Sequence, residues 1–176
     1  TVLPPDPTDS DWTLTTRNLV NACEALGKML ISAADGAGAR RAYDRAIGAR
    51  TKLAAAMSTR IDLQLDIVEL HERIAAAGLD KDRHKDQAIA LLRRLAGEWT
   101  FDAKSGSSFA SKLAARGLYT EALALTETIL TNVSKAGKGS PESLAKETAK
   151  QLGLVAWYAL LARRFDRAGT ASRRAV

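Results

Sequence analysis

The sequence predicts an all-α fold, and three observations lead to this prediction. Only 5% of the residues are aromatic and only four prolines interrupt a 176-residue chain rich in alanine, leucine and arginine. This composition favours helices over strands. Apolar residues recur at helical spacing, as at Leu19, Cys23, Leu26 and Leu30. Pairs of small residues also recur, which favours antiparallel helix pairs stacked as an α-solenoid.

Each recurring pair is a small residue followed twelve residues later by an alanine. We expect the first member to lie where two helices cross, because a small side chain lets their backbones approach closely. The alanines at positions 39, 88, 122 and 168 advance by 49, 34 and 46 residues, which predicts about three and a half units of irregular length. The pairs are Gly27/Ala39, Ala76/Ala88, Ala110/Ala122 and Ala156/Ala168.

The first half of the chain is expected to contain four helices. Residues 1–11 hold Pro4, Pro5 and Pro7 and are predicted to form an extended lead-in. Helices are predicted over residues 12–33 and 39–57, separated by the glycine-containing turn at 35–38. The apolar pattern resumes over residues 60–77. The charged residues 78–85 are predicted to form a turn before a helix over 86–99.

The second half is expected to add two further helix pairs. A loop over residues 100–106 precedes helices over 107–115 and 119–133, with Gly117 as the left-handed residue between them. Residues 135–139 are predicted to form a linker. Ser140, Pro141 and Glu142 are typical of a helix start, so a long helix is expected over 142–163. Its partner is predicted to begin at Phe165.

The composition indicates a folded chain. Hydrophobic residues make up 46% and charged residues 26%, a balance that excludes general disorder. We expect one domain over residues 12–176 and no membrane span, because no apolar run approaches about 20 residues. The single cysteine, Cys23, is predicted to be a small buried hydrophobe in a reducing cytoplasm. Because the chain lacks an initiator methionine and ends inside a helical pattern, we expect a fragment of a larger protein.

Three of the units resemble the tetratricopeptide repeat. Its unit is two antiparallel helices with a small residue where they cross, an alanine at the start of the second helix and an aromatic residue just before it. Tyr119 and Phe165 supply that aromatic residue. The unit around Ala75, Ala76 and Ala88 matches weakly, because it has Lys85 in place of the aromatic residue, and an extra residue in its turn is one interpretation. Only the step of 34 residues equals the family's usual length. The resemblance covers residues 20–176, and its best stretches are Gly27 with 38–46, Ala110 with 117–122, and Ala156 with 164–168.

The resemblance implies a concave groove and a role in protein–protein interaction. The family's groove-lining positions map onto Asn21, Glu24, Lys28, Glu69, Glu72, Ser107, Ser111, Lys150 and Trp157. Some members clamp a C-terminal carboxylate with a groove rich in lysine and asparagine, but the three glutamates here argue against that activity. We expect a non-catalytic adaptor that presents the groove to a peptide or protein segment. Trp157 is either an anchor in this groove or an ordinary packing residue.

The charge distribution leaves two alternative functions open. The chain has a net charge of +6 and a pI near 9.7, with basic residues concentrated over 36–60 and 163–174 and acidic residues over 61–82. The first alternative is a basic helical module that binds nucleic acid or another polyanion, although the acidic segment argues against it. The second is a regulatory arm of an enzyme whose catalytic domain lies outside this chain. An apolar edge after Phe165 would also allow a homodimer through the open C-terminal end.

No motif predicts an enzyme, a cofactor or a metal site. His71 and Glu72 resemble the first half of a zinc-protease motif, but Ala75 stands where the second histidine is required. We therefore predict that His71 is a helix-surface or interface residue and that His84 lies in a solvated turn. Residues 105–108 and 137–140 lack the spacing of a nucleotide-binding loop, so they are interpreted as a loop and as a linker with a helix cap.

Overall fold

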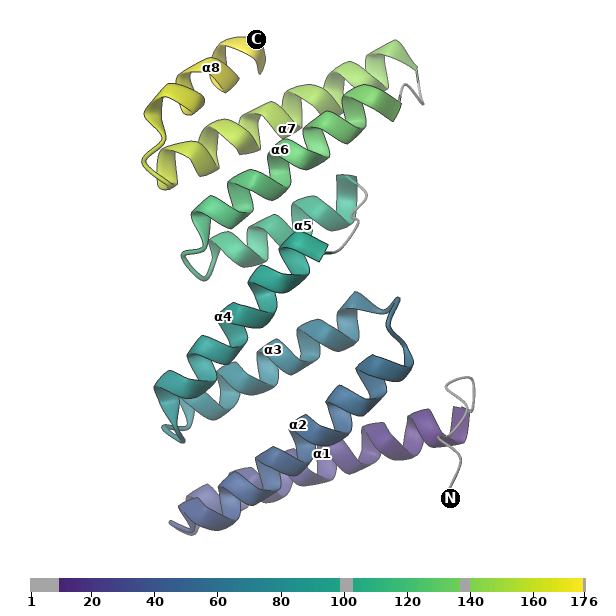
Figure 1. Cartoon of the computed structure of the whole chain (residues 1–176), viewed down its shortest axis with the longest axis vertical. Coiled ribbons are helices and arrows are strands. Elements are labelled where there is room, and N and C mark those ends of the chain that lie inside the picture. The colour runs from purple at the N-terminus through teal and green to yellow at the C-terminus, as the bar shows by residue number, and fades with distance from the viewer. Residues whose placement is uncertain (1–9, 99–102, 137–139, 176) are drawn as a thin grey trace. The chain divides into compact units, whose positions relative to one another are not determined.

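The computed structural model describes residues 10–98, 103–136 and 140–175, and these ranges contain eight α-helices and no strand (Figure 1). The prediction of an all-α fold is confirmed. Contacts divide the chain into two compact units, residues 1–92 and 93–176, so the single domain over 12–176 stays a prediction. The helices are α1 (Ser10–Ser32), α2 (Gly36–Ala56), α3 (Ile61–Ala76), α4 (Lys81–Glu98), α5 (Ala103–Ala114), α6 (Tyr119–Ala136), α7 (Pro141–Leu161) and α8 (Phe165–Ala175).

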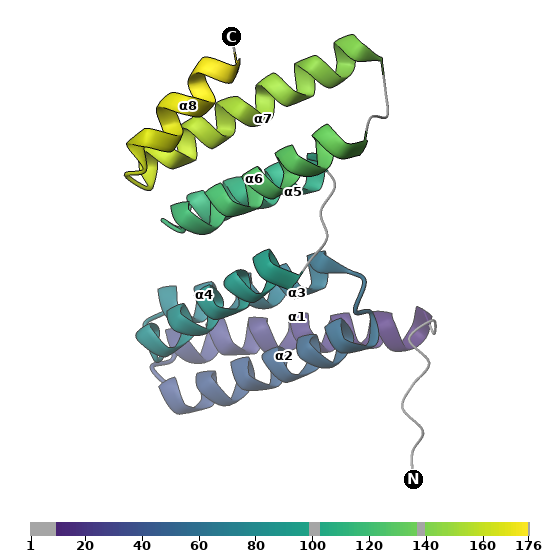
Figure 2. The same ribbon diagram turned by 45° about the horizontal axis from the view of Figure 1, so that its top comes forward.

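In the first unit, α1 and α2 lie side by side and α3 packs against α2 (Figure 2). Tyr43 of α2 and Leu70 of α3 belong to one apolar cluster, together with Val20 and Cys23 of α1. The burial of Cys23 confirms its prediction as a small hydrophobe. A second cluster forms around Leu53, Ala54, Leu63 and Ile67, with Trp12 against its edge.

In the second unit, each helix from α5 to α8 packs against the next one along the chain. Leu113 of α5, Ala122 and Ile129 of α6, and Leu152 and Tyr158 of α7 are all buried. Because both helices of a pair bury apolar residues against each other, and α6 also packs against α7, the apolar stripe of α6 is covered on two sides. Such shared burial is what short amphipathic helices need for stability.

The turn inside each successive pair of helices has the same backbone geometry. Ala34, Gly78, Gly117 and Arg163 all have positive φ, from 58° to 78°. In each turn the N–H of the following residue donates to the carbonyl oxygen five residues earlier: Asp35 to Leu30, Leu79 to Ile74, Leu118 to Leu113, and Arg164 to Ala159. This is the hydrogen bond that ends a helix in a Schellman motif. The prediction for Gly117 is confirmed, and the same turn is built without glycine at Ala34 and Arg163.

These turns define the register of the repeat and correct one of the predicted pairs. Seven residues before the positive-φ residue stand Gly27, His71, Ala110 and Ala156, in chain order. Ala76 is exposed, so the prediction that it pairs with Ala88 at a helix crossing is wrong. The residue at the crossing in the second pair is His71, which is buried. These four positions advance by 44, 39 and 46 residues, and none of these steps equals 34.

The second turn is one residue longer than the others, which explains the wrong register. In the first, third and fourth pairs, the first helical hydrogen bond after the turn is donated by the residue five positions after the positive-φ residue: Ala39, Ala122 and Ala168. In the second pair it is donated by His84 to Asp80, six positions after Gly78. Asp80 is the extra residue, with φ 43°. Consequently α4 begins at Lys81, inside the segment predicted to be a turn, and His84 lies within the helix. The first turn of α4 is too polar for its start to be recognised from an apolar pattern.

Other boundaries differ from the predictions by a few residues. The helix α5 begins at Ala103, inside the predicted loop, and α6 extends to Ala136, into the predicted linker. The predicted cap at Ser140 is confirmed, because its side chain accepts a hydrogen bond from the Ser143 amide at 3.2 Å. Asp35 caps α2 in the same way by accepting a hydrogen bond from the Gly38 amide at 2.8 Å. Residues 1–9, 100–102 and 137–139 of the predicted lead-in, loop and linker lie outside the described residues. Over residues 10–98, 103–136 and 140–175, no helix has the length and apolar content to cross a bilayer.

Gly27 allows a close approach between α1 and α2. A Cβ added at Gly27 would lie 2.8 Å from two ring carbons of Tyr43, closer than side-chain atoms normally approach. Tyr43 is itself buried, so its ring has little room to move. The prediction that a small residue is required at this crossing is therefore confirmed at Gly27. Ala110 is also fully buried, whereas Ala156 is half-buried.

Replacing Gly27 with alanine should lower the free energy of unfolding by about 1–3 kcal/mol, because the new methyl group overpacks the contact with Tyr43. Gly48→Ala in α2 is the matched control, since no atom lies within 4 Å of a Cβ there. This control should raise stability by about 0.5–1 kcal/mol through helix propensity. Urea denaturation followed by circular dichroism measures both changes. Equal effects of the two substitutions would contradict the close contact at Gly27.

Candidate partner-binding surfaces

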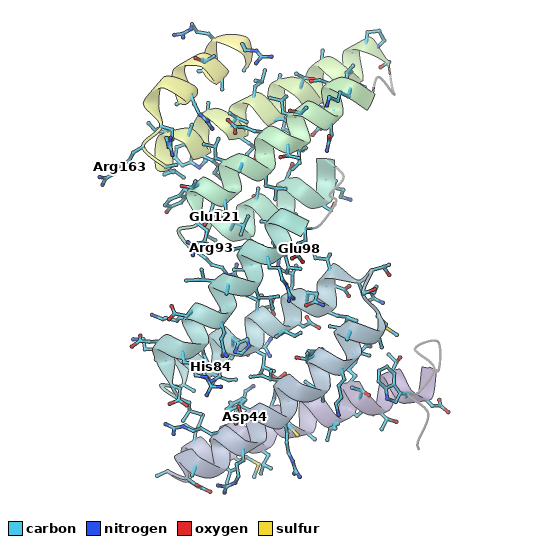
Figure 3. The ribbon with its side chains drawn as sticks, in the orientation of Figure 1. Asp44, His84, Arg93, Glu98, Glu121 and Arg163 are labelled. Atoms are coloured by element: carbon cyan, nitrogen blue, oxygen red, sulfur yellow. The ribbon has the colours of Figure 1, made fainter. Side chains whose placement is uncertain are left out.

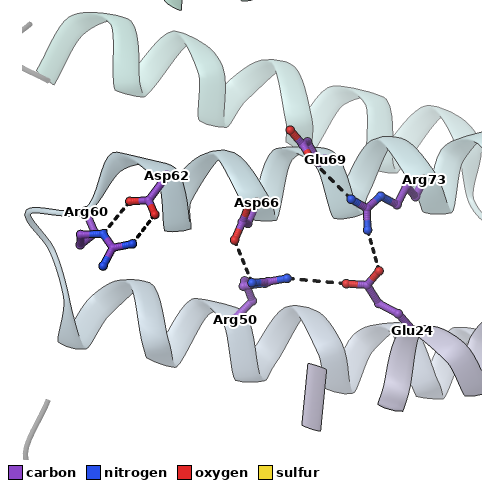
Figure 4. A network of polar contacts seen from close by, with 7 residues as sticks. All are labelled: Glu24, Arg50, Arg60, Asp62, Asp66, Glu69 and Arg73. Carbon is purple, nitrogen blue, oxygen red and sulfur yellow. Dashed lines mark hydrogen bonds and ion pairs between the residues drawn. The ribbon is translucent and has the colours of Figure 1, made fainter. Parts of the chain in front are cut away.

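A buried carboxylate joins the first three helices of the first unit (Figure 4). Glu24 of α1 accepts a hydrogen bond from Arg73 of α3 at 2.7 Å and lies 3.8 Å from the guanidinium of Arg50 on α2. Arg50 also donates to Asp66 of α3 at 2.8 Å, and Arg73 reaches Glu69 at 3.4 Å. Charges of opposite sign therefore alternate along the network. Because Glu24 is buried and doubly paired, its carboxylate contributes to the structure rather than to an open groove.

Burial and neighbouring charges shift the pKa values around this network. Burial raises the pKa of Asp66, even though Arg50 lies beside it. Burial, with the nearby charge of Glu24, also raises the pKa of Tyr43. At the start of α3, the hydrogen bond from Arg60 lowers the pKa of Asp62.

A second polar cluster joins α5 and α7 in the second unit. Gln151 of α7, which is fully buried, donates to Ser107 at 2.9 Å and to Glu147 at 2.7 Å. The hydroxyl groups of Ser111 and Tyr158 lie 3.3 Å apart. Lys150 forms an ion pair with Glu147 at 3.7 Å. Two of the predicted groove residues, Ser107 and Ser111, are thus brought together with α7.

The predicted groove residues have different surroundings. Asn21 and Lys28 are exposed on α1, while Glu69 and Glu72 are half-buried on α3. In the corrected register, Glu69 is not equivalent to any other predicted groove residue. This register places Trp157 in a row of residues that each follow a crossing residue: Lys28, Glu72, Ser111 and Trp157. Trp157 is 55% exposed, so its indole lies at the surface of α7.

His71 and His84 form a buried pair between α3 and α4. Their Nδ1 atoms lie 2.8 Å apart and their ring centroids 5.1 Å apart. The prediction that His84 lies in a solvated turn is wrong, because its side chain is buried. The pair occupies the crossing positions that hold small residues in the other units. Asp44 of α2 lies near His84, and its negative charge raises the pKa of that imidazole (Figure 3).

Burial lowers the pKa of both imidazoles below the ordinary value of 6.5, and Arg83 adds to this effect. Only one of the two Nδ1 atoms can carry the hydrogen of the bond between them, so protonation of both rings would break it. Within the described ranges, no group of three or more metal-ligating side chains occurs. Because the two buried rings lie on neighbouring helices and share a short hydrogen bond, the pair is interpreted as a structural contact between α3 and α4.

Two surface hollows lie along α1 and α2 and share Arg45, and neither was predicted from the sequence. Leu19 of α1 and Lys52 of α2 border the first hollow, and Leu26 of α1 borders the second. The signal in the sequence is the alternating spacing of three and four residues along α1, which continues a helical seam. We define the α1–α2 groove as Trp12, Thr16, Leu19, Cys23, Leu26, Leu30, Asp35, Gly38, Arg41, Ala42, Asp44, Arg45, Gly48, Ala49 and Lys52.

Several of the arginines behind the predicted basic character are used in ion pairs. Arg40 pairs with Asp80 at 3.1 Å in the first unit. In the second unit, Arg93 pairs with Glu121 at 2.7 Å (Figure 3). Arg167 pairs with Glu127 at 3.1 Å. Arginines paired within the chain are less available for phosphate groups. The alternative of a polyanion-binding module therefore rests on fewer cations than the net charge suggests.

Comparison with protein-family models gives no match, and no curated protein or solved structure is significantly similar to the chain. The resemblance to the tetratricopeptide repeat therefore stays a prediction from the sequence.

Replacing Glu24 with glutamine should destabilise the protein by about 2–4 kcal/mol, because it leaves Arg50 and Arg73 without their shared carboxylate. Glu69→Gln removes another partner of Arg73 at a more exposed position and should cost about 0.5 kcal/mol or less. Chemical denaturation of the two variants checks this difference. Equal stability of both variants would show that Glu24 is not central to the network.

The histidine pair should make stability dependent on pH. Because the folded state binds protons less readily than the unfolded state at these rings, the free energy of unfolding should fall as pH drops below about 6.5. Above that value both states are neutral at the rings and the contribution is constant. Replacing both histidines with alanine, as at Ala110 and Ala122 of the third pair, should flatten this dependence. Denaturation between pH 5 and 8 tests it, and an unchanged slope in the variant would contradict the assignment.

Proposed function

We propose that the chain is a non-catalytic scaffold of helix pairs that binds a peptide or protein segment through the surface around Trp157. The observation that carries this proposal is the exposed indole at a repeat-equivalent position. Exposed tryptophans are enriched among residues that dominate binding energy, because they bury a large apolar area when a partner covers them.

The surroundings of Trp157 on α7 support a role in binding. Lys150, Gly153 and Leu160 are exposed and lie on the same side of the helix, at seven and four residues before the indole and three residues after it. No atom lies within 4 Å of a Cβ added at Gly153, so the surface beside the indole is open. An aromatic anchor, an apolar neighbour and a cation together suit a partner segment that has both apolar and acidic side chains.

The repeated turns support the scaffold part of the proposal. Four turns of one backbone geometry separate helices with crossing residues at equivalent positions. Polar contacts also link first helices of successive pairs, Glu24 to Arg73 in the first unit and Ser107 to Gln151 in the second. A stack of antiparallel pairs would have these contacts along one surface and would present a row of side chains to a partner.

Other functions remain less supported by the described residues. The arginine pairs described above weaken the case for a polyanion-binding module. A regulatory arm of an enzyme stays a prediction, as does a homodimer through α8. No contact described above carries either of them.

Trp157→Ala should weaken binding of any peptide selected against this surface by at least about tenfold, because a central aromatic anchor contributes more than 1.4 kcal/mol. Selection of peptides from a random displayed library against the intact chain, followed by fluorescence anisotropy, measures this. Leu14→Ala is the matched control, since Leu14 is 56% exposed on α1. Both variants should keep wild-type stability. Selected peptides that all bind the Trp157 variant unchanged would reject the proposed surface.

A further inference from the structure

The α1 helix has two leucines exposed at positions where the equivalent residues of α3 are buried. In the corrected register, Leu19 is equivalent to Leu63 and Leu26 to Leu70. Leu19 and Leu26 are 51% and 48% exposed, whereas Leu63 and Leu70 are 3% and 1% exposed. Residues at equivalent positions of a repeat differ this much in exposed fraction only if a neighbouring element covers one set of side chains and leaves the other set open.

A preceding helix covers the leucines of α3. Leu63 packs in the cluster around Leu53 of α2, and Leu70 in the cluster around Tyr43 of α2. The same holds for α7, where Val155 is equivalent to Leu26: it is 5% exposed and lines one surface with Leu130 of the preceding helix α6. The groove beside Leu19 and Leu26 is therefore the place where a preceding helix would pack on α1.

The shape of the α1–α2 groove fits a helix. It extends along α1 from Trp12 to Leu30, which is about 27 Å or five helical turns. Its α1 residues alternate at spacings of three and four, the pattern with which one helix packs lengthwise on another. Gly48 leaves an opening in the opposite wall, since no atom lies within 4 Å of a Cβ placed there.

The charge of the groove fits an acidic partner. Arg41, Arg45 and Lys52 follow one another along the wall formed by α2, and none of them has an ion pair with any residue of the described ranges. Two acids also border the groove. Asp35 caps its own helix, and Asp44 lies near His84 on the side of α4. The unpaired charge along this wall is positive.

We propose that the α1–α2 groove binds an amphipathic helix of a partner protein, whose leucine-like stripe covers Leu19 and Leu26 and whose acidic edge faces Arg41, Arg45 and Lys52. A second copy of this chain fits less well. A two-fold contact would bring the two basic walls together, and α8 as the incoming helix would add the cations Arg167, Arg173 and Arg174. This surface belongs to the first unit and does not rest on the surface around Trp157.

The test uses two synthetic helical peptides of about 18 residues with the same leucine stripe. One has glutamates along one edge of the stripe, and the other has lysines at those positions. The acidic peptide should bind the intact chain, and the basic one should bind at least about tenfold more weakly. Reversing the wall with Arg45→Glu and Lys52→Glu should exchange this preference. Isothermal titration calorimetry gives the affinities, and circular dichroism checks that the variants are folded.

Two variants of α1 separate this proposal from its competitors. Leu26→Asp should weaken the acidic peptide by at least about tenfold, whereas Met29→Asp, an exposed control on α1, should change affinity less than about twofold. Trp157→Ala should leave the affinity for the acidic peptide unchanged. A failure of the proposal for the surface around Trp157 is therefore distinguished from a failure of this one. The proposal is overturned if neither peptide binds or if the charge reversal does not exchange the preference. It is likewise overturned if the peptide binds only after deletion of residues 1–9. Self-association of the free chain that Leu26→Asp abolishes would point to a second copy as the occupant and would also overturn it. Binding of a nucleic acid to the basic wall that does not depend on Leu26 would overturn it as well.

Discussion

The arrangement of the first unit depends on the contact between the backbone of Gly27 and the ring of Tyr43. Because no side chain separates them, α1 and α2 approach closely enough for Glu24 to lie beside Arg50. The same carboxylate then reaches Arg73, which ties α3 to α1. A larger residue at position 27 would separate the helices and weaken apolar and ionic contacts together. The approach also determines where the outer walls of the α1–α2 groove lie.

The second pair solves the same packing problem with different chemistry. Where the other pairs bring small residues together, it places two imidazoles in a hydrogen bond. The extra residue Asp80 delays the start of α4 by one position, so the partner of the crossing residue moves from twelve to thirteen residues away. A repeat can therefore keep its turn geometry while it changes both the residue type and the spacing at the crossing.

Much of the fold could be predicted from the sequence, because its signals are local. The apolar spacing of three and four residues indicated the helices, Gly117 indicated its turn, and Ser140 with Pro141 indicated the start of α7. The left-handed residues of the turns at Ala34 and Arg163 could not be recognised, since neither alanine nor arginine typically adopts that conformation. The polar first turn of α4 concealed its start, and with it the pairing of His84. The site was harder to predict: the resemblance placed Glu24 in a groove, but its burial depends on arginines 26 and 49 residues away. The exposed leucines of α1 acquire meaning only when the burial of their equivalents in α3 is known.

The central claim is that α1 and α2 leave open the place of a preceding helix. Nuclear magnetic resonance spectra of the ¹⁵N-labelled chain, recorded with increasing amounts of the acidic helical peptide, test it most directly. The account predicts that the amide signals that move are those of Leu19, Leu26, Gly48 and their neighbours on the outer side of α1 and α2. Shifts confined to the surface around Trp157, or spread evenly over the exposed residues of both units, would contradict it.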